Sequence, residues 1–399
     1  MKNKYAIIFI LIILSINLTG CFLFPPRGNT AEWTVMVYLD SDNNLESAGI
    51  NDINEMEMVG STTDVNIVVQ ADRIPGYDIS NSDWTNTRRY FITQDSDPTQ
   101  INSQLKGELG ELNMGDPQTL IDFTNWVTIN YPAKKYLLVI WNHGGGFRSP
   151  AYTAKDIAWD DTSGGDKITM PELEYAFSAI SAQIGKNIDI VGMDACLMAM
   201  TEVAYQIKDH ADILVASEEN VPGDGWPYDT ILAQLIANPT MSSTQLATDI
   251  VDKYIYSYPY NDVTQSAIDL SYIDTLATQL SNFALAIMSD TLTPSINYME
   301  AAYSSQYYGD PDFIDLYDFC SNVLIYSYNI QVKSIALSIQ QTLISSVVIN
   351  SNYNGWSVSG SKGLSIYFPW YYAYNSNKYN STNFAQDTFW DEMLLSLGL

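Results

Sequence analysis

The segment Tyr136-Leu-Leu-Val-Ile-Trp141 is apolar along its whole length and runs directly into Asn142-His-Gly-Gly-Gly146. A strand without polar alternation is covered on both faces, as in a parallel sheet held between two layers of helices. The segment Ile188-Asp-Ile-Val-Gly-Met193 has the same character and runs directly into Asp194-Ala-Cys196. The two segments predict buried strands of an α/β sheet, each followed at once by a residue able to do chemistry.

Further strands and helices alternate around these two segments. Strands that alternate with helices predict a mostly parallel sheet with helices on both faces. We therefore expect a three-layer α/β/α sandwich over residues 32–262, followed by a mainly helical region, 263–399, with late strands such as 363–368. The other predicted strands span 33–39, 65–70, 87–92 and 213–217, and the predicted helices of the sandwich span 44–59, 117–130, 170–183 and 197–208.

The first residues are typical of an export signal. Two lysines precede an apolar run, Tyr5 to Leu14, and Leu18-Thr-Gly-Cys21 follows. A positive start, a short apolar stretch and small residues describe a signal peptide, here residues 1–20. The Leu-Thr-Gly-Cys sequence resembles the lipobox of bacterial lipoproteins, which predicts a lipid on Cys21, a tether over 21–31 and anchoring at the cell envelope. The alternative is an ordinary signal peptide with an incidental cysteine.

The composition narrows the classes of function. The formal net charge of −28 excludes recognition of a nucleic-acid backbone, which needs a basic surface. The acidity agrees with a soluble extracellular surface, and attraction of cationic substrates is compatible with it. The oligomeric state stays open.

Cysteine and histidine are scarce enough to limit the possible mechanisms. Beyond Cys21 there are only Cys196 and Cys320, and the two histidines are His143 and His210. Ligands bind at the carboxyl ends of parallel strands, where Cys196 and His143 are both predicted to lie. A thiol becomes a good nucleophile beside an imidazole or at a helix N-terminus, and the predicted helix 197–208 adds the second. We therefore predict a His143/Cys196 catalytic dyad.

Alternatives to the dyad stay open. Cys196 could be a structural cysteine or form a disulfide with Cys320, and the sequence after His143 could be only a turn. If the dyad is real, the glycines after His143 let a substrate backbone approach closely. The N–H groups of Gly144 and Cys196 are then the candidates for stabilising the oxyanion.

Several segments occur in the order and spacing of one known family. They are Trp33–Asp40, Val139–Gly146, Trp159–Thr162, Asp189–Met198, Ala216–Glu219 and Pro222–Pro227, with a weaker match at Gly363–Pro369. Together they resemble the clostripain-like cysteine peptidases. The resemblance implies a caspase-like fold, cleavage after Arg or Lys, His143 as base and general acid, and Cys196 as a nucleophile that forms a thioester.

The basic-residue preference also has a local rationale. Residues two apart on an extended segment face the same side, so Asp194 is placed to pair with a substrate cation next to Cys196. The resemblance gives the same role to Asp194 and a second acidic role to Asp224, with Trp226 packing beside the substrate. The alternatives are a helix N-cap for Asp194, turn chemistry for Asp224 and loop anchoring for Trp226.

Two further hypotheses come from the family. Relatives can cut themselves in the loop that corresponds to 147–158, which makes Lys155, and less so Arg148, a candidate self-processing site. Calcium dependence in some relatives leaves Ca²⁺ open as a cofactor, although the dyad requires none. The acidic pairs Asp40/Asp42, Asp160/Asp161 and Glu218/Glu219 have suitable oxygen ligands, but their spacing fits no regular calcium loop and the metal ligands stay unknown.

The sequence thus predicts a cysteine endopeptidase that cleaves proteins or peptides after Arg or Lys at the cell surface. The rival interpretation is a surface lipoprotein that has lost catalysis and binds peptides or glycans through its 28 tyrosines and 9 tryptophans.

Overall fold

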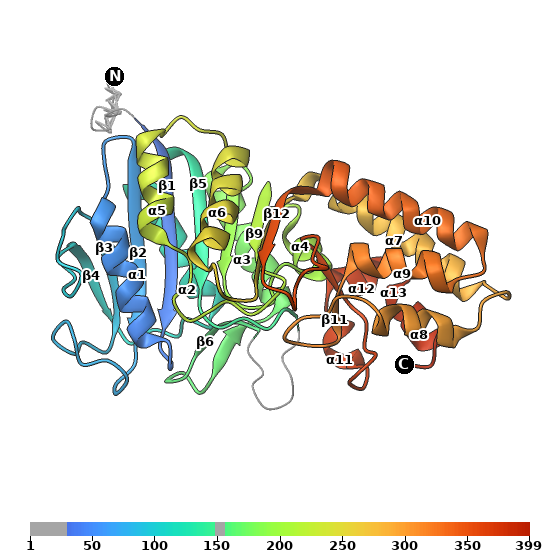
Figure 1. The fold of residues 1–399 in the computed structure, drawn as a ribbon. Helices are drawn as coiled ribbons and strands as arrows, with labels where there is room; N and C mark the ends of the chain where they lie inside the picture. The colour runs from blue at the N-terminus through green and yellow to red at the C-terminus, as the bar shows by residue number, and fades with distance from the viewer. Residues whose placement is uncertain (1–29, 148–155) are drawn as a thin grey trace, which may run out of the picture.

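The computed structural model describes residues 30–147 and 156–399. Its centre is a sheet of nine strands, five of them parallel, in which β1 (Ala31–Ser41) lies between β5 (Ala133–Trp141) and β2 (Val65–Arg73) (Figure 1). On one side the parallel part continues through β8 (Ile190–Asp194) to β9 (Ile213–Ala216). The edge strands are antiparallel: β3 (Thr87–Phe91) and β4 (Gln104–Gly110) beyond β2, and β10 (Val263–Asp269) and β12 (Val348–Asn354) beyond β9.

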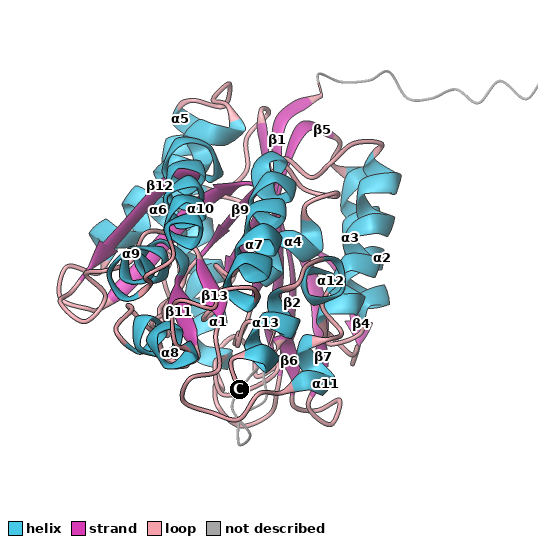
Figure 2. Ribbon diagram, turned by 90° about the vertical axis from the view of Figure 1, so that its right-hand side faces the viewer, coloured by secondary structure: helices cyan, strands magenta, loops and turns pink. Residues whose placement is uncertain are grey.

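Helices cover both faces of this sheet (Figures 1 and 2). Two separate cores, one on each face, contain the inward side chains of β1: Val35 and Val37 point to one, Met36 and Tyr38 to the other. This alternation within a fully buried strand is what a three-layer sandwich requires. One face carries α1 (Glu46–Val59), α5 (Tyr228–Ala237) and α6 (Ser243–Ser257), and the other carries α2 (Pro117–Asn130), α3 (Met170–Ile184) and α4 (Thr201–Ile207).

The C-terminal part continues the sheet and one of its cores. Strand β10 begins at Val263 and pairs with β9, and β12 closes that edge. Side chains of the C-terminal helices belong to the same core as those of α2, α3 and α4. The remaining elements are β6 (Ile157–Asp160), β7 (Asp166–Ile168), α7 (Ile273–Met288), α8 (Ser295–Tyr303), β11 (Phe313–Asp315), α9 (Leu316–Tyr326), α10 (Ile330–Thr342), β13 (Ser365–Tyr367), α11 (Ser376–Tyr379), α12 (Asn383–Asp387) and α13 (Trp390–Ser396).

The three-layer α/β/α fold predicted from the sequence is confirmed. The residues that the sequence marks as helix starts are also confirmed. Helix α2 begins at Pro117, and the Asp116 side chain accepts a hydrogen bond from the Gln118 N–H at 2.9 Å. At α3, Thr169 and Glu172 form a reciprocal capping box. The division at residue 263 stays a prediction.

The predicted helix 197–208 is wrong in its first turn. Helix α4 begins only at Thr201, because Leu197 has a φ of +62°, which no right-handed helix contains. The Leu197 N–H donates to the Glu219 carbonyl at 3.2 Å and the Ala199 N–H to the Ser217 carbonyl at 2.9 Å. Cys196 and Leu197 therefore form a turn, and these two hydrogen bonds hold the following residues against the end of β9. Asp194 is not a helix N-cap.

Some predicted features lie outside the described residues. These are the export signal, Cys21, most of the tether, Arg148 and Lys155. Within 30–147 and 156–399, no helix is both long and apolar enough to cross a bilayer.

Candidate active site

The register of two adjacent parallel strands places His143 beside Cys196. Trp141, at the end of β5, pairs with Asp194, at the end of β8. Each of the two predicted catalytic residues follows its strand end by two positions. A methyl group built on Gly144 would lie 2.4 Å from the Cys196 carbonyl oxygen and 3.0 Å from its backbone nitrogen. The loop after His143 thus packs directly on the backbone of Cys196, at a distance that only glycine permits.

His143 and Cys196 line one pocket of about 250 Å³. The pocket lies beyond the carboxyl ends of the strands, where α/β sheets bind their ligands. Its walls come from the ends of β5 and β8, the start of α1 and the segment after β9. The residues that line it are Leu45, Trp141, Asn142, His143, Asp194, Cys196, Asn220, Val221, Pro222, Gly223 and Gly225.

The Cys196 thiol is free and half-buried. Its sulfur accepts from the Val221 N–H at 3.2 Å. Burial raises the pKa of the thiol, and the charges of Glu219 and Asp194 raise it further, whereas the Val221 N–H lowers it. The helix N-terminus expected to lower this pKa is absent, because α4 starts five residues later. The second thiol, Cys320, is buried in α9 and also free.

The imidazole of His143 is held by the turn after β1. Its Nε2 lies 2.9 Å from Oδ1 of Asn44. The neighbouring Asn43 donates from Nδ2 to Oδ1 of Asn142 at 3.2 Å, which ties the same turn to the residue before His143. The other histidine, His210, lies just before β9 at the opposite edge of the sheet, 3.3 Å from Ser181 Oγ through Nδ1.

Asp194 is a buried carboxylate at the floor of the pocket, with 3% of its surface exposed. One oxygen, Oδ2, accepts from the Trp226 N–H at 3.0 Å and the Tyr228 hydroxyl at 3.1 Å. Oδ1 has no partner in the described part of the chain. Burial raises the pKa of Asp194 to about 7, although the hydrogen bonds from these two donors lower it.

The model of the clostripain family, Peptidase_C11, matches residues 37–396. The chain belongs to the clostripain family. Clostripain of Hathewaya histolytica is 28% identical over 419 residues, covering 90% of this chain and 78% of that protein. Membership makes the chain a cysteine-type endopeptidase.

Solved structures show that the fold is the caspase-like fold of this family. A secreted C11 cysteine protease of Bacteroides thetaiotaomicron, in complex with an irreversible peptide inhibitor, superposes with a TM-score of 0.68 at 21% identity, covering 91% of this chain and all 100% of that one. An inactive zymogen C11 protease of Parabacteroides distasonis also gives 0.68, at 19% identity, covering 92% and 99%.

Two acidic residues beside the pocket of this clostripain-family chain were missed from the sequence. Asp52 Oδ2 accepts from the Trp141 indole N–H at 2.6 Å, and Glu55 Oε2 from the Tyr228 N–H at 3.0 Å. Burial, followed by the charge of Asp194, raises the pKa of Asp52 well above its usual value. The signal was present, since Asp52 falls on the buried 49–52–56 stripe of α1.

Asp224 and Trp226, the other two residues predicted to contact the substrate, differ from each other in exposure. Asp224 is exposed on a tight turn, closed by the Gly225 N–H donating to the Pro222 carbonyl at 2.9 Å. Trp226 is 1% exposed, and its ring packs on Gly192. A methyl group built on that glycine would lie 2.6 Å from the ring. This geometry fits loop anchoring for Trp226, and the substrate role of Asp224 stays a prediction.

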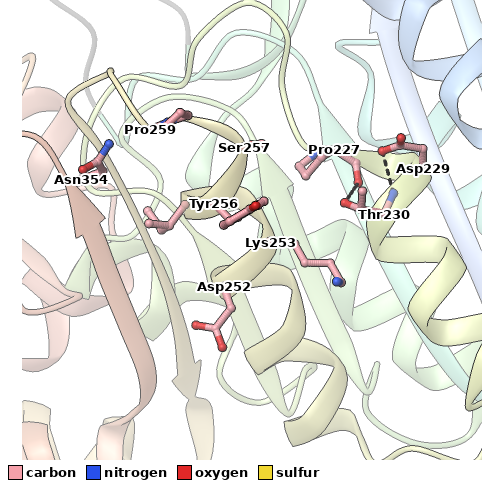
Figure 3. Close-up of a pocket in the computed structure, with 10 residues that line it drawn as sticks. Pro227, Asp229, Thr230, Asp252, Lys253, Tyr256, Ser257, Pro259 and Asn354 are labelled. Atoms are coloured by element: carbon pink, nitrogen blue, oxygen red, sulfur yellow. Dashed lines mark hydrogen bonds between the residues drawn. The ribbon is translucent and has the colours of Figure 1, made fainter.

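A second, larger recess of about 1110 Å³ lies on the face covered by α5 and α6. Asp229 and Thr230 of α5, and Asp252, Lys253 and Tyr256 of α6, line it (Figure 3). Neither histidine nor cysteine is among its lining residues. The chemistry of the family therefore points to the smaller pocket.

Proposed function

We propose that this clostripain-family chain cleaves peptide bonds after Arg or Lys, with Cys196 as nucleophile and His143 as its base. The observation that carries the proposal is the register of β5 and β8, in which Trp141 pairs with Asp194. With Gly144 packed on the Cys196 backbone, that register supports placing imidazole and thiol on the walls of one pocket.

The chemistry would be nucleophilic acyl transfer. The sulfur of Cys196 attacks the carbonyl carbon of the substrate while His143 takes the thiol proton. The C–N bond then breaks, the leaving amine receives that proton, and a thioester remains. Water gives a proton to His143 as its oxygen attacks the thioester carbon, the C–S bond breaks, and the imidazolium returns this proton to the departing Cys196 sulfur. The raised pKa of the thiol favours proton transfer at the moment of attack over a preformed thiolate.

The oxyanion would be stabilised by two backbone donors. The N–H groups of Gly144 and Cys196 lie in the same contact between loops, where a methyl group built on Gly144 would lie 3.0 Å from the Cys196 nitrogen. Preorganised donors of this kind need no reorientation as negative charge develops on the substrate oxygen.

Specificity for a basic side chain would come from the acids at the pocket floor. The Oδ1 of Asp194 is buried without a partner in the described ranges. Asp52 lies nearby, because a methyl group built on Gly225 would lie 2.9 Å from Oδ2 of Asp194 and 3.3 Å from Oδ2 of Asp52. A buried carboxylate is costly without a cation, and a guanidinium or ammonium group would supply one. Asp224, exposed at the rim, adds a further negative charge.

The same proposal extends to location and processing. The structural relative from Bacteroides thetaiotaomicron is described as secreted, and we propose export of this chain with a lipid on Cys21, where it would act on surface proteins or peptides. We also propose self-cleavage after Lys155, or less so Arg148. N-terminal sequencing of a fully active preparation would contradict this if it showed one uncut chain.

The experiment is an assay with matched reporter peptides that end in Arg, Lys or Ala before the scissile bond. Wild type should release the Arg and Lys reporters, and Cys196→Ala should lower turnover by about 10⁴-fold or more. Cys320→Ala is the control, since it removes the other core thiol and should leave turnover nearly unchanged. Turnover that survives in Cys196→Ala contradicts the assignment, and no turnover of any reporter by wild type favours the binding protein.

A further inference from the structure

Another recess lies beside the catalytic pocket, between the loop 304–309 and the turn 356–360, and is called the Trp356 recess below. Its volume is about 550 Å³. Glu219 lines this recess, whereas the next residue, Asn220, lines the catalytic pocket. A methyl group built on Gly309 would lie 2.1 Å from Nδ2 of Asn220, so the loop packs directly on this residue. A peptide in the catalytic pocket needs to cross only the ridge of Asn220 and Gly309 to reach the Trp356 recess.

The Trp356 recess combines negative charge with exposed aromatic rings. Its charged lining residues are both acidic, Glu219 and Asp318. In the described ranges, neither carboxylate forms an ion pair with a lysine or arginine. Trp356 and Tyr307 also line the recess, with 90% and 51% of their surfaces exposed. Carboxylates beside open aromatic faces are the surroundings that favour a guanidinium or ammonium group.

The walls of the Trp356 recess are fixed by hydrogen bonds of the protein itself. Oε1 of Glu219 accepts from the Gly309 N–H at 3.0 Å. Gln306 joins the two walls, because its Nε2 donates to the Ser357 carbonyl at 2.8 Å and its Oε1 accepts from the Gly360 N–H at 3.1 Å. A recess that is already held in shape loses little conformational entropy when a ligand binds.

The strand order sets the distance between the two sites. From β8, which Cys196 follows, the order runs through β9 and β10 to β12, and Trp356 lies two residues beyond the end of β12. Strand β12 runs parallel to β9, because both are antiparallel to β10, so the two strands end at the same edge. Three strand spacings of about 4.8 Å separate β8 from β12, about 14 Å in all. An extended peptide covers this distance with about four residues of about 3.4 Å each.

We propose that the Trp356 recess binds a second basic side chain of the substrate, about four residues from the bond that is cut. The ring of Trp356 stacks on the cation, and the carboxylate of Glu219 pairs with it. This inference rests on the proposed cleavage after Arg or Lys. It extends the specificity from one basic residue to two basic residues at a set spacing.

Peptide binding to the Cys196→Ala chain tests the recess without turnover. Each peptide has Arg before the scissile bond and, between two and six residues away on either side, a second Arg or its neutral analogue citrulline. Calorimetry should show about tenfold tighter binding of the Arg peptide than of the citrulline peptide at a spacing of about four residues. Trp356→Ala and Glu219→Gln, each added to the Cys196→Ala chain, should bring this ratio close to 1.

Tyr256→Ala is the matched control. Its ring is 88% exposed like that of Trp356, but it lines the larger recess on the face of α5 and α6. The Arg-to-citrulline ratio should therefore stay as in the parent chain. Trp356→Phe should keep part of the preference, because a smaller aromatic face remains.

Two results would overturn the inference. One is a ratio near 1 at every spacing in the parent chain, and the other is a ratio that Trp356→Ala and Glu219→Gln leave unchanged. Failure of the proposed function is a separate result, in which the active chain cleaves no reporter after Arg or Lys while the binding ratio still measures the recess. In the active chain, kcat/KM should show the same dependence on the second Arg.

Discussion

Two groups of acids lie at the same edge of one sheet, yet their surroundings differ. Asp194 lines the 250 Å³ pocket that also contains Cys196, and Asp52 lies beside Asp194. The cluster group consists of Asp42, Asp72, Glu111 and Asp160, and one oxygen from each lies within 4.8 Å of the others. A substrate side chain carries a single charge and must enter and leave through a pocket.

The comparison teaches that the surroundings of a carboxylate decide its role more than its burial does. Asp194 and Asp42 both have a pKa raised to about 7 by burial, and each has one oxygen without a partner in the described part of the chain. They differ in what surrounds that oxygen: an open pocket beside a thiol for Asp194, and three other acids for Asp42.

Asp194→Asn should have the largest effect on the pocket side. We expect kcat/KM for an Arg reporter to fall by about 100- to 1000-fold, because the buried partner of the guanidinium is lost. A citrulline reporter, of the same shape but neutral, should change little. Asp42→Asn serves as the control, since it removes an equally buried acid and should leave the Arg-to-citrulline ratio unchanged. Equal losses for both reporters would assign Asp194 a structural role.

The pH dependence of selectivity should follow the ionisation of Asp194. The carboxyl is neutral below its pKa of about 7 in the free enzyme and negative above it. The Arg-to-citrulline ratio of kcat/KM should therefore rise about tenfold per unit of pH below 7 and level off above it. The ratio cancels the effects of pH on the steps that both reporters share. A ratio that is flat between pH 5 and 8 contradicts the assignment.

Asn44→Ala tests whether the turn after β1 positions His143. Loss of the 2.9 Å contact to His143 should lower kcat by about 3- to 10-fold with KM nearly constant, because the imidazole is less well positioned. A change confined to KM would show that Asn44 contacts substrate instead.

Tyr228→Phe should have the smallest effect. Its hydroxyl donates to Asp194 at 3.1 Å and lowers the pKa of that carboxyl. Without this donor the pKa of Asp194 rises, and the midpoint of the Arg-to-citrulline ratio should move to higher pH by less than about one unit. Measuring the ratio at closely spaced pH values from 6 to 9 checks the shift, and a midpoint that moves to lower pH would contradict the assignment.

Local patterns in the sequence predicted the fold and the residues at the ends of β5 and β8. Apolar runs identify buried strands, and Pro117 and Thr169 mark the starts of helices. Because parallel strands all end at the same edge of a sheet, the loops after β5 and β8 were expected to meet there. The sequence misplaced the start of α4, because the positive φ of Leu197 is set by contacts with Ser217 and Glu219. It missed Asp72 and Glu111 because their proximity depends on strand order, which no local pattern encodes.

Covalent labelling tests the central claim most directly. The full chain is treated with a peptide chloromethyl ketone ending in Arg, digested and mapped by mass spectrometry. The account predicts one adduct, on Cys196, that forms far more slowly in His143→Ala and in Asp194→Asn, with Cys320 unlabelled. An adduct on another residue, or labelling of Cys196 at an unchanged rate in His143→Ala, would contradict it.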